Sequence, residues 1–317
     1  MKGVFLDKAS VDPGDLDLSN LRTLLTDFTL FDLTGPDELA ARIKDAEIII
    51  SNKVVINRQH MLDNPSLKLI CVAATGYNNI DIEAARDQGI RVCNVRHYAT
   101  HSVVEHVFGG ILSMSRHLSA YHDAAKGDIW RNSPFFCVLD YPIQELNGRT
   151  IGIIGYGDLG RGVAEKARQF GMNILVAQSL TGEKKPDRVG LDQLLAESDV
   201  VTLHSPLTEE SKNLISKREF GLMKNSAYLV NVARGGIVDE QALAEALRDK
   251  EIAGAIIDVL SKEPPSPDNP LLATDIPNLL LTPHIAWAGR NSRQALIDQI
   301  SGNIDAFIRG NTKNVVV

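Results

Sequence analysis

The sequence predicts an α/β protein made of two consecutive units, each a doubly wound parallel sheet. Short β-branched runs alternate with helical patterns from one end of the chain to the other. Because parallel strands need long crossover connections, which are usually helices, this alternation favours parallel sheets. The pattern starts afresh at Thr150, and a chain of 317 residues is long enough for two domains of about 150 residues each.

Both units have a full set of predicted strands. In the first unit, β-branched segments predict strands at 3–6, 29–33, 47–51, 69–73 and 91–95. Helical patterns lie between them at 37–44 and at 82–88, and the second is preceded by the N-cap residue Asp81 and followed by Gly89. In the second unit, strands are predicted at 150–154, 173–177, 200–204, 227–232, 254–259 and 279–282.

Two further helical patterns define the domain organisation. A long helix predicted at 103–125 joins the units, and Ser102 with Glu105 has the spacing of a capping box at its start. A last helix predicted at 292–309 follows the completed second sheet, so we expect it to pack back on the first unit. The expected domains are therefore 1–99 with 288–317, and 100–287.

Composition excludes several classes of partner. The net charge of -7 offers no positive field for a phosphate backbone, so we expect no nucleic-acid partner. No apolar run approaches the roughly 20 residues that a membrane helix needs, so we expect no membrane partner. The acidic residue Asp7 interrupts the N-terminal segment before the apolar core of a signal peptide could form. The three cysteines have no paired spacing that would indicate disulfides. We therefore expect a cytoplasmic protein with reduced thiols and no metal site.

A glycine-rich segment connects strand 150–154 to a helix that runs to Phe170. Its residues are Gly155, Tyr156, Gly157, Asp158, Leu159 and Gly160. In this context the first glycine makes a tight turn, the second lets a pyrophosphate approach the backbone, and the third packs helix on strand. The phosphates would bind at the helix N-terminus. The segment predicts a Rossmann dinucleotide-binding domain, and we expect all six residues to contact the cofactor.

The next strand ends without the acid that NAD enzymes place against the ribose 2′-hydroxyl. Gln178 and Ser179 stand there instead. No carboxylate would repel a 2′-phosphate, which nearby polar groups could meet: Ser179, Thr181, Lys184 and Lys185. However, no arginine follows the strand immediately, and Gln178 could equally hydrogen-bond the ribose hydroxyls. The cofactor is therefore NAD or NADP, and we predict appreciable use of NADPH. Further cofactor contacts are expected at later strand ends: His204, Ser205, Pro206, Val232, Ala233 and Asp258.

Three polar residues also follow later strands, where open α/β sheets place their ligands. They are Arg234, Glu263 and His284. Hydride transfer to a 2-keto acid needs a cation for the carboxylate and carbonyl, a proton donor for the oxygen, and an acid that orients the donor. Each residue alone is compatible with an ion pair, a turn or a packed strand end, but together they predict that chemistry.

With the glycine motif, three segments resemble the D-isomer-specific 2-hydroxyacid dehydrogenases over essentially the whole chain. Residues 231–235 match that family's Asn-x-x-Arg-Gly, 258–264 match its Asp-Val-x-x-x-Glu-Pro, and 282–284 match its Thr-Pro-His. The resemblance implies that Arg234, Glu263 and His284 are the catalytic residues. It also implies that the first unit is a flavodoxin-like substrate-binding domain.

The same resemblance indicates the substrate contacts. Residues 73–81 look like the family's loop after the fourth strand, in which Thr75 and Gly76 would form an anion nest for the substrate carboxylate. Asn52 and Lys53 end the neighbouring strand and are expected to face the same crevice. Trp287 is a further expected substrate contact, and Trp130 would reach the active site of a partner subunit.

Within the family, the chain most resembles the glycerate dehydrogenase and hydroxypyruvate (glyoxylate) reductase branch. The residues that carry this resemblance are segments 76–81 and 139–143 and Trp287. We therefore expect reduction of hydroxypyruvate or glyoxylate to D-glycerate or glycolate, or the reverse, with His284 as the acid and base. Another 2-keto acid such as pyruvate is an alternative substrate, and a nucleotide-sensing, corepressor-like protein is an alternative function of a different class.

The apolar segment 126–140 has no sheet to bury it, which predicts a homodimer.

Overall fold

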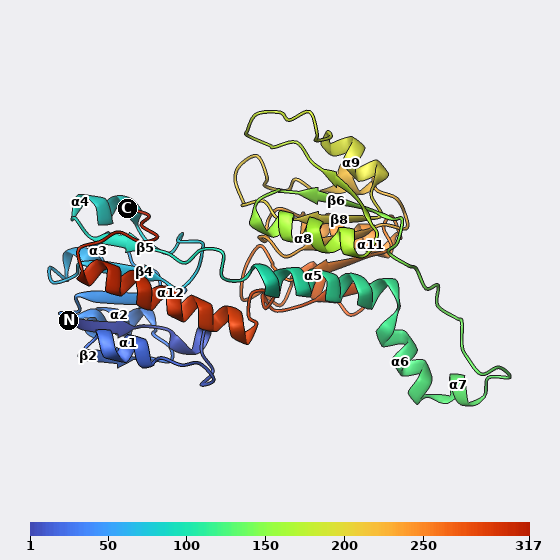
Figure 1. Ribbon diagram of the computed structural model, residues 1–317. Helices are drawn as coiled ribbons and strands as arrows, with labels where there is room; N and C mark the ends of the chain where they lie inside the picture. Colours follow the sequence, from blue (N-terminus) through green and yellow to red (C-terminus); the bar gives the residue numbers. More distant parts are fainter. The chain divides into compact units, whose positions relative to one another are not determined.

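The computed structural model describes all 317 residues, and the chain divides into two compact units (Figure 1). Unit 1 comprises 1–99 and 287–317, and unit 2 comprises 100–286. The boundary expected at 99/100 coincides with the first of these, and the one expected at 287/288 lies one residue after the second. The assignment of unit 1 to the substrate remains a prediction.

Unit 1 is built on a five-stranded parallel sheet with the order β2-β1-β3-β4-β5. Its strands are β1 (Lys2–Phe5), β2 (Asp27–Leu30), β3 (Ile48–Ser51), β4 (Leu69–Val72) and β5 (Arg91–Cys93). Every residue of β3 and β4 is buried, as expected of central strands covered on both faces. The strand predicted at 29–33 is observed as β2, which begins two residues earlier and lies at the edge of the sheet.

Helices cover both faces of this sheet. They are α1 (Ser19–Leu24), α2 (Pro36–Ile43), α3 (Arg58–Leu62), α4 (Ile82–Asp87) and α12 (Arg290–Ile308), with a short 3₁₀ turn at Lys8–Ser10. Leu296 and Ile300 of α12 pack with Leu21 of α1 on one face, and α2, α3 and α4 cover the other. The last helix therefore completes the core of the first unit, which confirms the sequence-based prediction.

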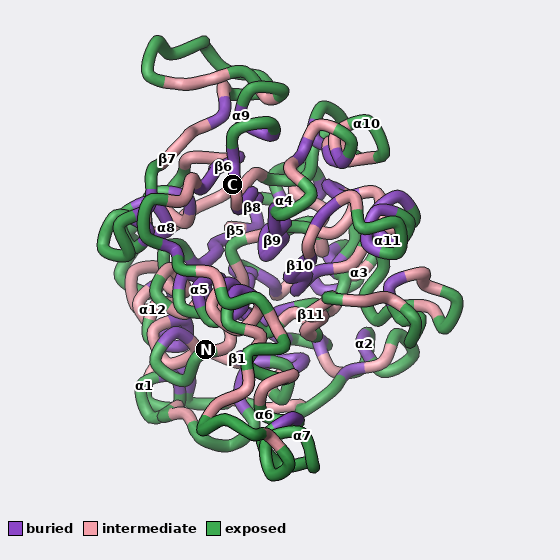
Figure 2. Tube along the Cα trace, turned by 90° about the vertical axis from the view of Figure 1, so that its right-hand side faces the viewer, coloured by how far each residue is buried: buried purple, intermediate pink, exposed green.

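Unit 2 has a six-stranded sheet, also entirely parallel, with the order β11-β10-β9-β8-β6-β7. Its strands are β6 (Thr150–Ile154), β7 (Asn173–Val176), β8 (Val200–Leu203), β9 (Tyr228–Asn231), β10 (Gly254–Ile257) and β11 (Leu279–Leu281). Central strands are buried while the surrounding loops are exposed, as Figure 2 shows for β8, β9 and β10. Two parallel-sheet α/β units are therefore confirmed.

Unit 2 has helices on both faces of its sheet and two more, α6 and α7, that extend away from it (Figure 1). They are α5 (Thr100–Ser115), α6 (Leu118–Lys126), α7 (Asp128–Arg131), α8 (Asp158–Gln169), α9 (Leu191–Glu197), α10 (Lys217–Phe220) and α11 (Glu240–Arg248), with a 3₁₀ turn at Pro270–Leu272. Leu194 of α9, Phe220 of α10 and Leu243 of α11 share one core cluster. On the other face, Gly110 of α5 lies against Ile256 of β10, and Gly160 of α8 lies against Ile153 of β6.

The prediction of a single helix at 103–125 is wrong in two respects. The chain breaks between α5 and α6 at His117, whose φ of 48° is left-handed and interrupts the helical hydrogen bonds. The helix also starts earlier, at Thr100, so Ser102 lies within its first turn rather than capping it. The Ser102 hydroxyl donates instead to the carbonyl oxygen of Ala286, at 2.7 Å.

Helices α6 and α7 and the chain that follows form an arm, residues 118–143, that extends away from the sheet of unit 2 (Figure 1). Two of its aromatic side chains are open to solvent, with Phe135 72% and Phe136 92% exposed. The Trp130 indole N–H donates to the carbonyl oxygen of Phe136, which folds the tip back on itself. No helix anywhere in the protein combines the length and apolar character needed to cross a bilayer.

Candidate active site

The ligand-binding edge of unit 2 follows from its strand order. All six strands are parallel, so their carboxyl ends lie at one edge of the sheet. The order reverses between β6 and β8, because the chain leaves β6 for β7 on one side and returns to β8 on the other. Such a switch point is where open α/β sheets bind dinucleotides.

The glycine turn lies at this point, between β6 and α8. Gly155 has a φ of +92°, and a Cβ there would lie 2.5 Å from the carbonyl carbon of His204. Gly160 has no room for a side chain either, because a Cβ would collide with the carbonyl oxygen of Gly155. Gly157 is the N-cap of α8, and the space beside its Cα is open. This arrangement leaves the backbone N–H groups at the start of α8 accessible to an anion.

Buried polar atoms near the same turn fit a dinucleotide. The Nδ1 atom of His204 and the Oγ atom of Ser205 are buried and have no hydrogen-bond partner within the protein. Burial lowers the pKa of His204 to about 4, so its ring is neutral near neutral pH. An unpartnered neutral ring nitrogen and hydroxyl beside a glycine turn suit the polar groups of a nicotinamide cofactor.

The loop after β7 is closed by Gln178. Its side-chain Nε2 donates to the carbonyl oxygens of Lys185 and Arg188, at 2.8 and 2.9 Å, and its Oε1 accepts from the Lys185 N–H. The Ser179 hydroxyl accepts from the N–H of Gly182 in the same loop. The expected contact of Gln178 and Ser179 with the ribose remains a prediction, and the structure adds that both side chains brace the loop.

Two of the three proposed catalytic side chains are in direct contact. The Nδ1 atom of His284 lies 2.6 Å from Oε2 of Glu263. The other carboxylate oxygen of Glu263 accepts from the backbone N–H of Leu260, which fixes its orientation. With Nδ1 held by the carboxylate, Nε2 is the ring nitrogen through which His284 would exchange a proton with a substrate.

Asp258 positions the chain segment that carries His284, a role that sequence reasoning missed. Its buried carboxylate accepts from the hydroxyl of Thr282 at 2.6 Å and from the N–H groups of Ile285 and Ala286, both at 2.9 Å. Its backbone carbonyl accepts from the N–H of His284, which has a left-handed φ of 54°. The sequence also predicts that Asp258 contacts the cofactor, and that contact remains a prediction.

Arg234 follows β9 in a turn organised by Asn231. The buried Asn231 amide donates to the carbonyl oxygen of Arg234 at 3.0 Å and accepts from the N–H of Ala233 at 3.1 Å. Arg234 is exposed, and its guanidinium donates to the carbonyl oxygen of Ala233. It forms no ion pair with a carboxylate of the chain, so it can receive an anionic ligand. Val232 and Ala233 are buried in the same turn.

The remaining residues expected at the site lie in unit 1 or outside the sheet edge. In unit 1, Asn52 and Lys53 follow β3, and both backbone N–H groups donate to the Asp7 carboxylate. Thr75 and Gly76 follow the neighbouring strand β4, at the same edge of that sheet. Trp287 packs edge-on against Tyr98 within unit 1, and Trp130 lies in the arm of unit 2.

Known proteins match the chain over its length. Residues 108–286 match the family described as D-isomer specific 2-hydroxyacid dehydrogenase, NAD binding domain. A glycerate dehydrogenase of Methylorubrum extorquens is 42% identical over 316 residues, which cover 99% of this chain and 98% of that protein. A hydroxypyruvate reductase of Blautia hydrogenotrophica is 36% identical, covering 100% of this chain and 99% of that one.

Solved structures agree with the sequence matches. An NAD-dependent formate dehydrogenase from Staphylococcus aureus, solved in complex with NAD, superposes with a TM-score of 0.81 at 28% identity, covering 100% of this chain and 99% of that one. The parallel strand order, the glycine turn and the family match together lead to one conclusion. The chain belongs to the D-isomer specific 2-hydroxyacid dehydrogenases, a family of nicotinamide-dependent oxidoreductases.

Proposed function

We propose that the protein reduces hydroxypyruvate to D-glycerate, with glyoxylate as a second substrate. The observation that carries the proposal is the 2.6 Å contact between His284 Nδ1 and Glu263 Oε2, at the sheet edge that also holds the glycine turn. Relatives of similar length named for glycerate dehydrogenase and hydroxypyruvate reductase support the choice of substrate.

Each residue of the site has a defined task in this reaction. A bound nicotinamide cofactor supplies the hydride to the carbonyl carbon. His284 donates its Nε2 proton to the carbonyl oxygen, which completes the alcohol, and takes that proton back in the reverse direction. Glu263 orients the ring through Nδ1 and stabilises its positive charge. Arg234 binds the substrate carboxylate and polarises the carbonyl, as its unpaired guanidinium allows.

Unit 1 would bind the rest of the substrate. Asn52 and Lys53 follow β3, and Thr75 and Gly76 follow β4, so these polar residues lie at one edge of the sheet. The backbone N–H groups of Asn52 and Lys53 are held by Asp7, which leaves their side chains and the turn at Thr75 and Gly76 for a substrate. Those groups suit a carboxylate and a hydroxyl rather than an apolar chain. We therefore assign the short, polar end of hydroxypyruvate to this unit, together with Trp287.

The proposal is tested by initial rates on hydroxypyruvate, glyoxylate, pyruvate and 2-ketoisocaproate, each with NADH and with NADPH. The highest kcat/KM is expected on hydroxypyruvate. His284→Ala should abolish turnover in both directions while leaving the Kd of the cofactor within about threefold, because the residue carries a proton and does not hold the nucleotide. Higher kcat/KM on pyruvate would assign the protein to another substrate, and no turnover on any 2-keto acid would refute an enzymatic role.

We further propose a homodimer held by the arm, acting in the cytoplasm. The exposed Phe135, Phe136 and Leu139 of the arm form an apolar surface that a second copy would cover. Sedimentation equilibrium at micromolar concentration should give the dimer mass, and Phe136→Ser combined with Phe135→Ser should shift it to monomer. A monomeric wild type would contradict the proposal. The three free thiols suit a reducing compartment.

A further inference from the structure

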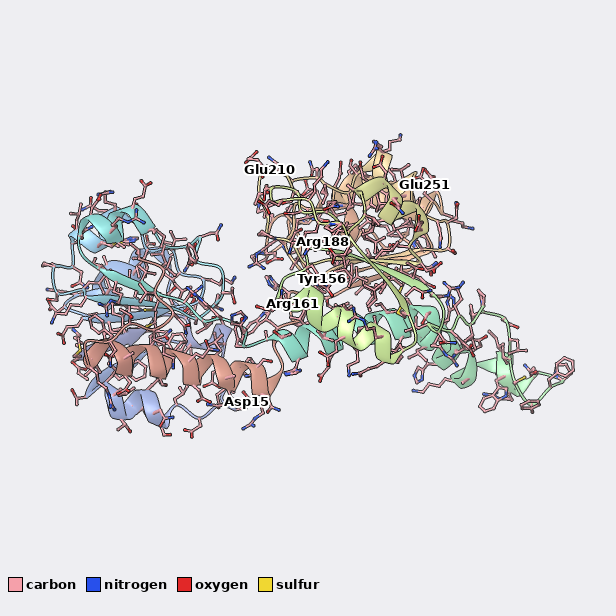
Figure 3. All side chains as sticks on the ribbon, turned by 45° about the horizontal axis from the view of Figure 1, so that its top comes forward. Asp15, Tyr156, Arg161, Arg188, Glu210 and Glu251 are labelled. Atoms are coloured by element: carbon pink, nitrogen blue, oxygen red, sulfur yellow. The ribbon has the colours of Figure 1, made fainter.

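The loop after β7 brings one arginine to the glycine turn. The guanidinium carbon of Arg188 lies 5.7 Å from the centre of the Tyr156 ring, a cation–π contact. Figure 3 shows Arg188, Tyr156 and Arg161 close together on unit 2. The contact joins the end of the loop, ten residues beyond Gln178 in sequence, to the middle of the segment that would cradle the pyrophosphate.

Arg188 occupies the closed base of this loop rather than its tip. Its carbonyl oxygen accepts from the Gln178 side chain at 2.9 Å, and the next residue, Val189, pairs with Ala177 in a parallel bridge. The backbone N–H of Gln178 also donates to the Val189 carbonyl oxygen, at 2.8 Å. These bonds hold Arg188 beside the strand end at which dinucleotide-binding domains contact the adenosine ribose.

The charge of Arg188 is not neutralised within the chain. Arg161, the other cation beside Tyr156, forms an ion pair with Asp158. Arg188 forms no ion pair with a carboxylate of the protein, and its side chain is half-buried. Lys184 and Lys185 of the same loop are exposed, so their positive charges are more strongly screened by solvent and salt.

We propose that Arg188 binds the 2′-phosphate of NADPH and so determines cofactor preference. This inference rests on the proposed cofactor-binding role of unit 2. The guanidinium stands between the end of β7 and the glycine turn, which is the position of the ribose 2′-oxygen in such domains, and its planar fork suits a phosphate. Gln178 then acts by holding the loop, because its amide is already engaged with Lys185 and Arg188.

The test uses two fragments that differ only in the phosphate in question, 2′,5′-ADP and 5′-AMP. Their Kd values are measured by titration calorimetry at fixed ionic strength on wild type, Arg188→Ala and Arg188→Lys. Wild type should bind 2′,5′-ADP more tightly. Arg188→Ala should weaken 2′,5′-ADP on the order of 10- to 100-fold, the loss typical of a charged hydrogen bond, and leave 5′-AMP within threefold. Arg188→Lys should retain an intermediate preference.

Two controls separate this role from a structural one. Arg168→Ala removes an exposed cation from the last turn of α8 and should change neither Kd. Lys184→Ala should have a much smaller effect than Arg188→Ala; an equal or larger one would transfer the role to the tip of the loop and overturn the proposal. Equal weakening of both fragments by Arg188→Ala would also overturn it, because the residue would then support adenine or the fold.

Failure of this inference differs from failure of the proposed function. If wild type does not distinguish the two fragments yet reduces hydroxypyruvate with NADH, the role of Arg188 is refuted and the function stands. If Arg188→Ala loses only 2′,5′-ADP but wild type reduces no 2-keto acid, the role of Arg188 stands and the function is refuted.

Discussion

Asp258→Asn should damage the active site without changing any residue proposed to take part in the chemistry. Oδ1 of Asp258 accepts from the Thr282 hydroxyl and the Ile285 N–H, and Oδ2 accepts from the Ala286 N–H. An asparagine has one acceptor oxygen and one amide nitrogen. In either orientation of the amide, its nitrogen faces the N–H of Ile285 or of Ala286.

The magnitude follows from this mismatch. A buried donor left without an acceptor costs about 1–3 kcal/mol, and a hydrogen bond to a charged group contributes about 1.5–3 kcal/mol. These two contributions overlap, so we expect unit 2 to lose about 2–4 kcal/mol of unfolding free energy. The segment 282–286 would also shift, and a displacement of about 1 Å at a reacting group can cost about 100-fold in rate. We expect kcat to fall between 10- and 100-fold.

The assay combines stability, binding and turnover. Calorimetry with and without NAD identifies the transition of unit 2 as the one that the nucleotide shifts. Hydroxypyruvate reduction gives kcat and KM, and a cofactor titration gives Kd. Asp239→Asn is the matched control, because that carboxylate caps α11 and accepts from Ala242 N–H and Ser216 hydroxyl away from His284. The control should lose stability but keep its kcat.

The reasoning would be refuted if Asp258→Asn lowered stability by less than about 0.5 kcal/mol, well under the cost of one orphaned donor. An equal fall in kcat for Asp258→Asn and Asp239→Asn would also refute it, because the loss would then reflect general destabilisation of unit 2.

Three further predictions concern the same unit. Glu263→Gln replaces the carboxylate that lies 2.6 Å from His284 Nδ1, and should lower kcat/KM about 10- to 100-fold with cofactor Kd unchanged. Gly155→Ala places a Cβ 2.5 Å from a backbone carbon at a φ of +92°, and should weaken cofactor binding at least about tenfold in a titration. Burial lowers the pKa of His204 from 6.5 to about 4, so below pH 6.5 the unfolded chain takes up the proton first and stability falls with pH. Between pH 7 and 5 the loss should reach about 2 kcal/mol, and His204→Gln should remove that part of the pH dependence in calorimetry of the cofactor-free protein.

Each of these three has a contrary outcome. Wild-type kcat/KM in Glu263→Gln would show that the carboxylate does not support the proton donor. Unchanged cofactor affinity in Gly155→Ala would place the dinucleotide elsewhere. The same acid sensitivity in His204→Gln as in wild type would show that this ring does not remain neutral in the folded protein.

The strands were predictable because central parallel strands are buried on both faces. Ile48, Ile49 and Ile50 of β3 are fully buried, and an unbroken apolar run of this kind appears directly in a sequence. The end of α4 was equally clear, since Asp81 caps its first turn and Gly89 has the left-handed φ of 67° that ends it. Local side-chain chemistry specifies such features without help from distant residues.

Other features depend on contacts that a linear pattern does not contain. Helix-forming residues lie on both sides of the break at His117, so the helical periodicity of the sequence does not reveal it. The engagement of Gln178 with backbone oxygens of its own loop, and the contact of Arg188 with Tyr156, arise only once the loop folds back. The pairing of His284 with Glu263 was expected, because both residues follow strands of one parallel sheet and the family resemblance assigns them to one site.

The chain passes between unit 1 and unit 2 twice, at residues 99–100 and 286–287. The hydroxyl of Ser102, just after the first crossing, donates to the carbonyl oxygen of Ala286, just before the second. Both ends of the chain that leave unit 2 are therefore tied to one another inside that unit. Asp258 adds a third point of attachment, because its carboxylate also accepts from the N–H of Ala286. His284 lies before this tie and so belongs, like the glycine turn, to the hydrogen-bonded body of unit 2.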